Sequence, residues 1–158
     1  MAVLRAEPLG WASSSYRVSS GEEEVTQLAI SLFKGKGTFE VDGQAFTIDS
    51  HGFTRAHATM KRGSSVIAKV KSTKFFGRRF EISSAGHQLV LEGQGLMGKT
   101  YVLRLMNKEV GWIRKYGFAG RKLSLDFPEE VPVFLQVLIT YVVISQARRE
   151  GAAAAAGG

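Results

Sequence analysis

The chain has 158 residues, of which 44% are hydrophobic and 22% are charged, a balance typical of one globular domain with its own core. It contains no cysteine, which excludes disulfides, thiolate nucleophiles and cysteine-based metal sites. The net charge is +7, and residues 55–122 alone hold 15 basic and 3 acidic residues. Such a block favours a polyanionic partner, although a basic surface that is merely solvated is the alternative.

The first segment, residues 1–27, has no basic region followed by an apolar core and a small-residue cleavage site. No secretory signal is therefore expected, and a cytoplasmic location is predicted. We expect residues 1–27 to form an N-terminal segment that adds at most the first strand or strands of the fold.

Between Leu28 and Phe127, apolar residues recur with period two and are interrupted by Gly, Asp, Asn or Ser. This pattern predicts an antiparallel meander in which many strands have one wet face, as in a barrel or a sandwich. Asp42-Gly43 predicts a two-residue hairpin turn, because both positions of such a turn require positive φ. A second turn is predicted at Asn107-Lys108, and Trp112 is expected in the core.

The last element is a predicted helix over residues 129–149, with acidic residues near its start and Arg148-Arg149 near its end, as the helix dipole favours. It is apolar on nearly every side, which requires burial either in lipid or inside the preceding sheet. The apolar stretch, residues 131–145, is short for a bilayer span. Residues 150–158 form a Gly/Ala tail that is expected to be disordered.

Five segments, in this order, resemble the tubby-like superfamily, which includes tubby C-terminal domains, LURP-one-related proteins and phospholipid scramblases. They are residues 39–43, 66–71, 101–105, 110–113 and 123–128. The resemblance covers residues 28–149 and implies a closed antiparallel β-barrel of about twelve strands around one apolar C-terminal helix. Calcium-driven scrambling is not expected, because residues 120–126 begin basic and lack the oxygen ligands that calcium needs.

Consecutive loops of a meander alternate between its two ends, so the loops near residues 72–78, 93–99 and 116–122 should lie together. The resemblance to tubby domains, which bind phosphoinositides, and the residue types suggest contact with an anionic membrane or phosphoinositide. The predicted ligand-binding residues are Lys74, Arg78, Lys99, Lys115, Arg121 and Lys122. The predicted membrane-contacting residues are Phe75, Phe76, Leu96, Met97, Tyr116 and Phe118. The alternative is that these aromatics close the barrel end while the basic groups are solvated.

Other chemistries are less well supported by the sequence. Nucleic acid is disfavoured because the basic residues come without a recognition helix or an RNA-binding signature. Residues 93–100 fit the P-loop spacing, but a strand rather than a helix is predicted after them. His51 and His57 would lie about 20 Å apart on one strand, too far to share a metal ion.

No enzyme activity, metal or cofactor is therefore expected, and the predicted function is that of a non-enzymatic binding module. The first alternative is a structural or protein-interaction domain without a lipid role. The second is a tail-anchored membrane protein whose last helix spans the bilayer.

Overall fold

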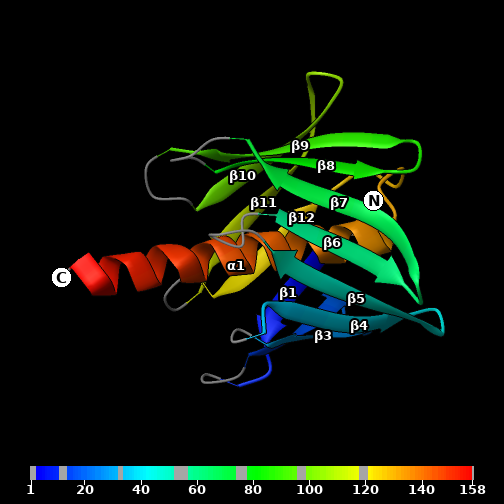
Figure 1. Ribbon diagram of the computed structural model, residues 1–158, viewed down its shortest axis with the longest axis horizontal. Helices are drawn as coiled ribbons and strands as arrows, with labels where there is room; N and C mark the ends of the chain where they lie inside the picture. Colours follow the sequence, from blue (N-terminus) through cyan, green and yellow to red (C-terminus); the bar gives the residue numbers. More distant parts are fainter. Residues whose placement is uncertain are drawn as a thin grey trace.

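The structure is a computed structural model that describes residues 3–10, 14–31, 34–51, 57–73, 78–95, 99–117 and 121–157, with side chains up to residue 150. In this part of the chain, twelve antiparallel strands form a closed barrel around one helix, as predicted (Figure 1). Each strand pairs with the next in sequence, and β1 pairs with β12 to close the barrel. The elements are β1 (Leu4–Pro8), β2 (Ser15–Ser20), β3 (Glu23–Ser31), β4 (Lys36–Val41), β5 (Gln44–His51), β6 (His57–Arg62), β7 (Ser65–Ser72), β8 (Arg79–Ser84), β9 (His87–Gln94), β10 (Thr100–Leu105), β11 (Lys108–Tyr116), β12 (Lys122–Asp126) and α1 (Val133–Gly157).

The helix fills the barrel, because every residue from Leu135 to Ile144 is buried. Two of its buried hydroxyl groups have partners inside: Thr140 Oγ1 donates to the carbonyl of Gln136 at 2.8 Å, and the Tyr141 hydroxyl lies 2.6 Å from Ser50 Oγ on β5. An all-round apolar helix is stable in water only when it is enclosed. The sheet, rather than lipid, therefore buries this helix. Among the described residues, none of the helices reaches the length and apolar character of a membrane span.

Residues 1–27 supply β1, β2 and the start of β3, so the barrel begins well before Leu28. β1 pairs with β2 on one side and with β12 on the other, for example Leu4 with Ser20 and with Leu125. The N-terminal strand thus removes the two edges that an open sheet would expose. Closure of the barrel depends on it.

The chain enters the barrel by crossing the inner face of β11 at Gly111. A Cβ atom at Gly111 would collide with the carbonyl oxygen of Asp126 and would lie 3.1 Å from Cα of Phe127. Only glycine leaves room for the backbone at this crossing. After the crossing, Phe127 is buried and the chain turns through Pro132 into α1.

The predicted limits of the helix are wrong at both ends. Residues 129–132 lie outside it, because the Pro132 carbonyl accepts the first helical hydrogen bonds, from the backbone nitrogens of Leu135 and Gln136. At the other end α1 continues to Gly157, through the segment expected to be disordered. Alanine has the highest helix propensity, and five alanines in a row extend the helix that the barrel nucleates.

The hairpin turn at Asp42-Gly43 is confirmed, with φ angles of 52° and 75°. The turn between β10 and β11 lies one residue earlier than predicted, at Met106-Asn107, where both residues have positive φ. Trp112 is not a core residue, because Val110 is an extra residue that shifts the register after Leu103. The bulge turns Ile113 into the core and leaves Trp112 half-buried on the outer wall, beside Arg114.

A second shift affects β7. Ala68 and Val70 are buried as the alternation predicts, but Val66 is 47% exposed. The register between β6 and β7 slips between Met60 and Lys61, so that Met60 pairs with Ala68 whereas Lys61 pairs with Val66. The slip turns Val66 away from the core.

Candidate functional site

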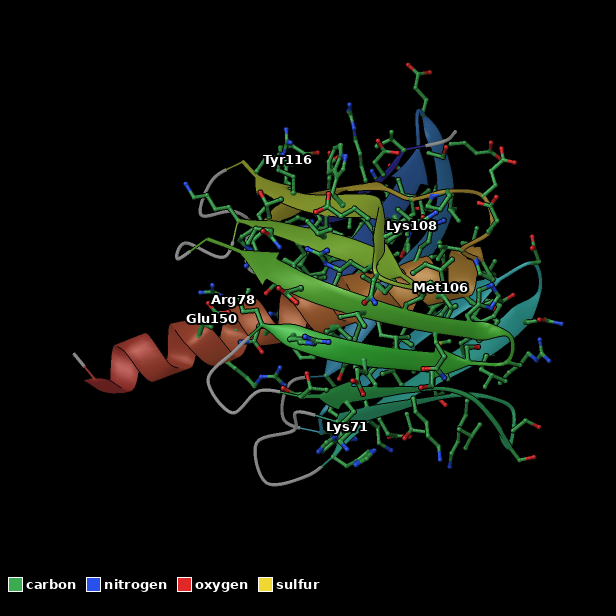
Figure 2. All side chains as sticks on the ribbon, turned by 90° about the horizontal axis from the view of Figure 1, so that it is seen from above. Lys71, Arg78, Met106, Lys108, Tyr116 and Glu150 are labelled. Carbon is green, nitrogen blue, oxygen red and sulfur yellow. The ribbon has the colours of Figure 1, made fainter. Side chains whose placement is uncertain are left out.

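We call the end of the barrel from which the C-terminal half of α1 emerges the helix-exit end. The connections β7–β8, β9–β10 and β11–β12 reach this end, and Arg78 and Glu150 mark it in Figure 2, opposite Met106 and Lys108. The strand ends that flank the three predicted loops are hydrogen-bonded neighbours. The Gly93 nitrogen donates to the Arg78 carbonyl and the Lys115 nitrogen to the Lys99 carbonyl, both at 2.7 Å. The strand ends that bound the three predicted loops therefore lie together, whereas loop residues 74–77, 96–98 and 118–120 lie outside the described residues.

Half of the predicted site residues lie outside the described residues. They are Lys74, Phe75, Phe76, Leu96, Met97 and Phe118. The other six all lie at or near the helix-exit end, but they have different environments. Lys99 is exposed, and Lys122 is half-buried with its aliphatic stem against Gly117.

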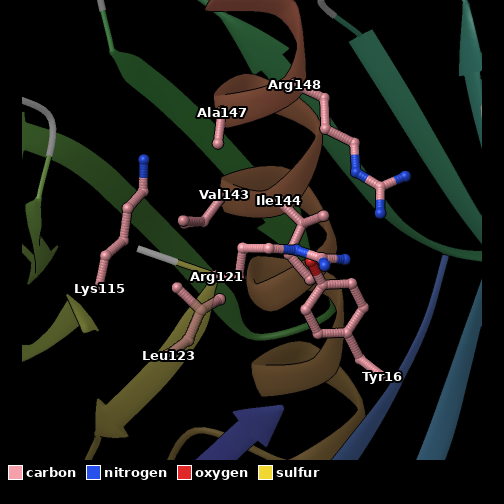
Figure 3. A pocket seen from close by; sticks show the side chains of 8 residues that line it. All are labelled: Tyr16, Lys115, Arg121, Leu123, Val143, Ile144, Ala147 and Arg148. Carbon is pink, nitrogen blue, oxygen red and sulfur yellow. The ribbon is translucent and has the colours of Figure 1, made fainter. Parts of the chain in front are cut away.

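Lys115 and Arg121 line one pocket of about 180 Å³ together with Arg148 of α1 (Figure 3). The same β11 bulge that turns Trp112 outward turns Lys115 toward the barrel interior, where its backbone pairs with buried Leu123. In Figure 3 Lys115 and Arg148 approach the pocket from opposite sides of the helix. The other lining residues are Tyr16, Leu123, Val143, Ile144 and Ala147.

Burial destabilises the protonated form of Lys115. Desolvation lowers the pKa of its ammonium group, Glu150 acts in the opposite direction, and Arg78 lowers the pKa further. The ammonium nitrogen lies 5.7 Å from the ring centroid of Tyr101, which adds a cation–π contact. A desolvated cation interacts strongly with any anion that reaches it.

Arg78, predicted to bind a ligand, forms an ion pair with the helix. Its guanidinium donates two hydrogen bonds to the Glu150 carboxylate, at 2.9 and 3.1 Å, and a third to the Gly95 carbonyl at 3.2 Å. Gln146 also donates to Glu150, at 3.1 Å. The bond to Glu150 is the main reason that the pKa of Arg78 is raised and that of Glu150 is lowered. This ion pair fastens the emerging helix to the residue that directly precedes β8.

Replacing Glu150 with Gln is expected to reduce the free energy of unfolding at pH 7 by about 1 kcal/mol, because the bidentate pair is only partly exposed. The pKa of Glu150 is lowered by folding, so the pair stabilises fully above the ordinary value of 4.5 and is lost as the pH falls through the lower folded pKa. The difference from the parent protein should therefore shrink at pH 3. Urea unfolding at both pH values measures it, with Glu81→Gln on the outer wall as control. An equal loss at both pH values would contradict an ionic contribution.

Tyr116, predicted to contact a membrane, has its hydroxyl 3.4 Å from a carboxylate oxygen of Glu7 on β1, to which it donates. Burial is the largest cause of its raised pKa, and the neighbouring Glu7 adds to it. Figure 2 shows the side chain on the outer wall beside the helix-exit end. It joins the β11–β12 hairpin to β1 and presents only part of its ring to solvent.

Three helix residues lie at this end of the barrel: Arg148 and Arg149, which the sequence analysis placed only at the end of a helix, and Glu150, which it placed in the tail. One signal would have found them. Polar residues that follow directly on an all-apolar buried helix must lie where the helix leaves its enclosure. Tyr16 on β2 lines the pocket as well, and no local pattern marks it.

The separation expected for His51 and His57 is wrong. They lie on two paired strands, β5 and β6, directly opposite each other, and their ring centroids are 6.0 Å apart. His51 Nε2 lies 3.0 Å from Thr59 Oγ1. In the described residues, no group of three or more metal-ligating side chains gathers here or elsewhere.

The P-loop-like segment, residues 93–100, runs from the end of β9 to the start of β10, and Thr100 opens a strand, as predicted. The glycine at position 93 is explained by close packing, because a Cβ atom there would lie 2.7 Å from Cβ of Arg78.

Searches of protein-family models, curated proteins and solved structures found no match to the chain.

Proposed function

We propose that the protein is a non-enzymatic binding module, a tubby-like barrel that contacts anionic membrane lipid or phosphoinositide through its helix-exit end. The observation that carries the proposal is the gathering of Lys115, Arg121 and Arg148 around one pocket with aliphatic walls. Lys99 and Lys122 extend the positive charge onto the rim of the same end. The resemblance of the sequence to the tubby-like superfamily supports the same assignment.

Long-range attraction explains how such an end would approach a membrane. Each Lys or Arg near an anionic surface contributes about 1 kcal/mol, and the contribution falls off within a Debye length. The rim lysines would provide this attraction, while the more deeply placed Lys115 would act only on a group that enters the pocket. Binding to vesicles should therefore depend on the rim charges and on salt.

The test is flotation of the purified protein with neutral vesicles and with vesicles that contain anionic lipid or phosphoinositide, at low and high salt. Binding only to the anionic vesicles, weakened by salt, is expected. Lys99→Glu combined with Lys122→Glu should weaken it by at least about 30-fold, which corresponds to two lost contributions of about 1 kcal/mol each.

The matched control is Arg62→Glu combined with Lys108→Glu, which makes the same charge change on exposed residues at the opposite end. This variant should keep most of the binding. Equal weakening by both variants would show that only net charge matters and would contradict a binding end. If the protein ignores every vesicle, the protein-interaction alternative replaces the proposal.

A further inference from the structure

The pocket of about 180 Å³ at the helix-exit end combines two kinds of lining. One part is cationic and comes from three elements or connections: Lys115 of β11, Arg121 just before β12, and Arg148 of α1. The other part is aliphatic and comes from Leu123, Val143, Ile144 and Ala147. Among the described lining residues there is no carboxylate. Positive charge and apolar surface therefore meet inside one hollow.

The guanidinium of Arg148 gives a second indication that a ligand binds in this pocket. Its Nη1 atom is buried, and it has no hydrogen-bond partner in the described part of the chain. A buried donor without an acceptor is costly, and the cost is larger for a charged group. An anionic oxygen in the pocket would supply the acceptor. Figure 3 shows the Arg148 side chain extending outward from the helix, on the side opposite Lys115.

The apolar wall restricts the kind of anion. An inorganic ion such as phosphate would exchange its hydration for contact with aliphatic side chains on one side, which is unfavourable. An amphiphile would place its charged head against the cations and its hydrocarbon against Ala147 of α1, which is the half-buried residue of the aliphatic lining. Both halves of the lining would then meet matching chemistry.

We propose that this pocket binds the carboxylate of a fatty acid, with the head group at the cationic part of the lining, which includes Lys115, and the first part of the acyl chain against the turn of α1 that carries Ala147. The inference rests on the proposed function in that it assigns a ligand class to the same end of the barrel. It adds that a single lipid molecule, detached from any membrane, is bound.

The experiment is isothermal titration with laurate below its micelle concentration. Acetate tests the head group alone, dodecyl maltoside below its micelle concentration tests the chain alone, and inorganic phosphate tests a plain anion. Laurate is expected to bind at least about tenfold more tightly than each of the three. Phosphate binding at the same site without laurate binding, or equal binding of laurate and dodecyl maltoside, would overturn the proposal.

Two variants locate the site. Lys115→Met keeps an aliphatic side chain and removes the charge, and it should weaken laurate binding at least about tenfold, as expected for a lost hydrogen bond to a charged group. Ala147→Phe should abolish binding by filling the pocket. The matched control, Lys71→Met, removes one charge from the exposed outer wall and should bind as the parent does. Equal weakening by Lys115→Met and Lys71→Met, or unchanged binding by both pocket variants, would overturn the proposal.

The outcomes separate this inference from the proposed function. Vesicle flotation without laurate binding removes the fatty-acid pocket and leaves the membrane-binding end. Laurate binding without flotation removes the membrane role and leaves the pocket. Thermal unfolding of each variant, followed by circular dichroism, confirms that the barrel is intact.

Discussion

Deletion of residues 133–157 is expected to abolish cooperative unfolding of the whole barrel. The buried part of α1, Leu135–Ile144, occupies the interior, and its removal would expose the inner side chains of the twelve strands to water. Burial of each large apolar side chain contributes about 1.5–3 kcal/mol, so the loss far exceeds the usual total stability of a domain. Circular dichroism during heating should show no sigmoidal transition.

A milder variant tests the same point in a chain of full length. Leu138 is completely buried, and Leu138→Ala should cost about 2–5 kcal/mol. Deletion of residues 151–158 is the control, because it keeps the buried segment and the Arg78–Glu150 ion pair. A barrel that unfolds cooperatively without its helix, with an unchanged midpoint, would contradict the enclosed-helix architecture.

Gly111→Ala is expected to destabilise the protein by about 3 kcal/mol, at the upper end of the usual cost of overpacking. The added Cβ would collide with the backbone of residues 126–127 where the chain crosses β11, and a backbone atom cannot move aside as a flexible side chain can. For a chain of this size the melting temperature should fall by about 6–12 °C. Differential scanning calorimetry measures the change.

Gly63→Ala provides the comparison for this prediction. Gly63 has a φ of +64° and open space around its Cα, so an alanine there meets only the cost of the left-handed backbone, about 1–2 kcal/mol. The Gly111 variant should be the less stable of the two. The reverse order would show that the crossing relaxes without difficulty.

Local signals in the sequence were enough for much of the architecture. The alternating pattern correctly identified inward-facing residues such as Phe80 and Ile82, or Leu123 and Leu125, because successive side chains of a strand point to opposite faces of the sheet. The turn at Asp42-Gly43 was predictable because few residue pairs accept positive φ at both positions. These features depend on the chain over a few residues only.

A helix that is apolar on all sides needs lipid or protein around it, and the family resemblance predicted that a barrel encloses it. The number of strands came from a family resemblance and agrees with the structure. Local patterns could not show where the helix ends. The barrel supports the first turns, and the alanine-rich continuation extends them to Gly157.

The sequence by itself determined that this protein is an antiparallel β structure with a basic middle region and a C-terminal helix that must be buried, because periodicity, turn residues and charge are properties of neighbouring residues. Tertiary structure alone decided the make-up of the pocket. One bulge at Val110 reverses the faces of β11, which moves Trp112 outward and Lys115 inward. Barrel closure and the emerging helix then bring Tyr16 and Arg148 to the same hollow. A slip of one residue changes the face of every side chain after it, and no pattern along the chain records which strands will meet.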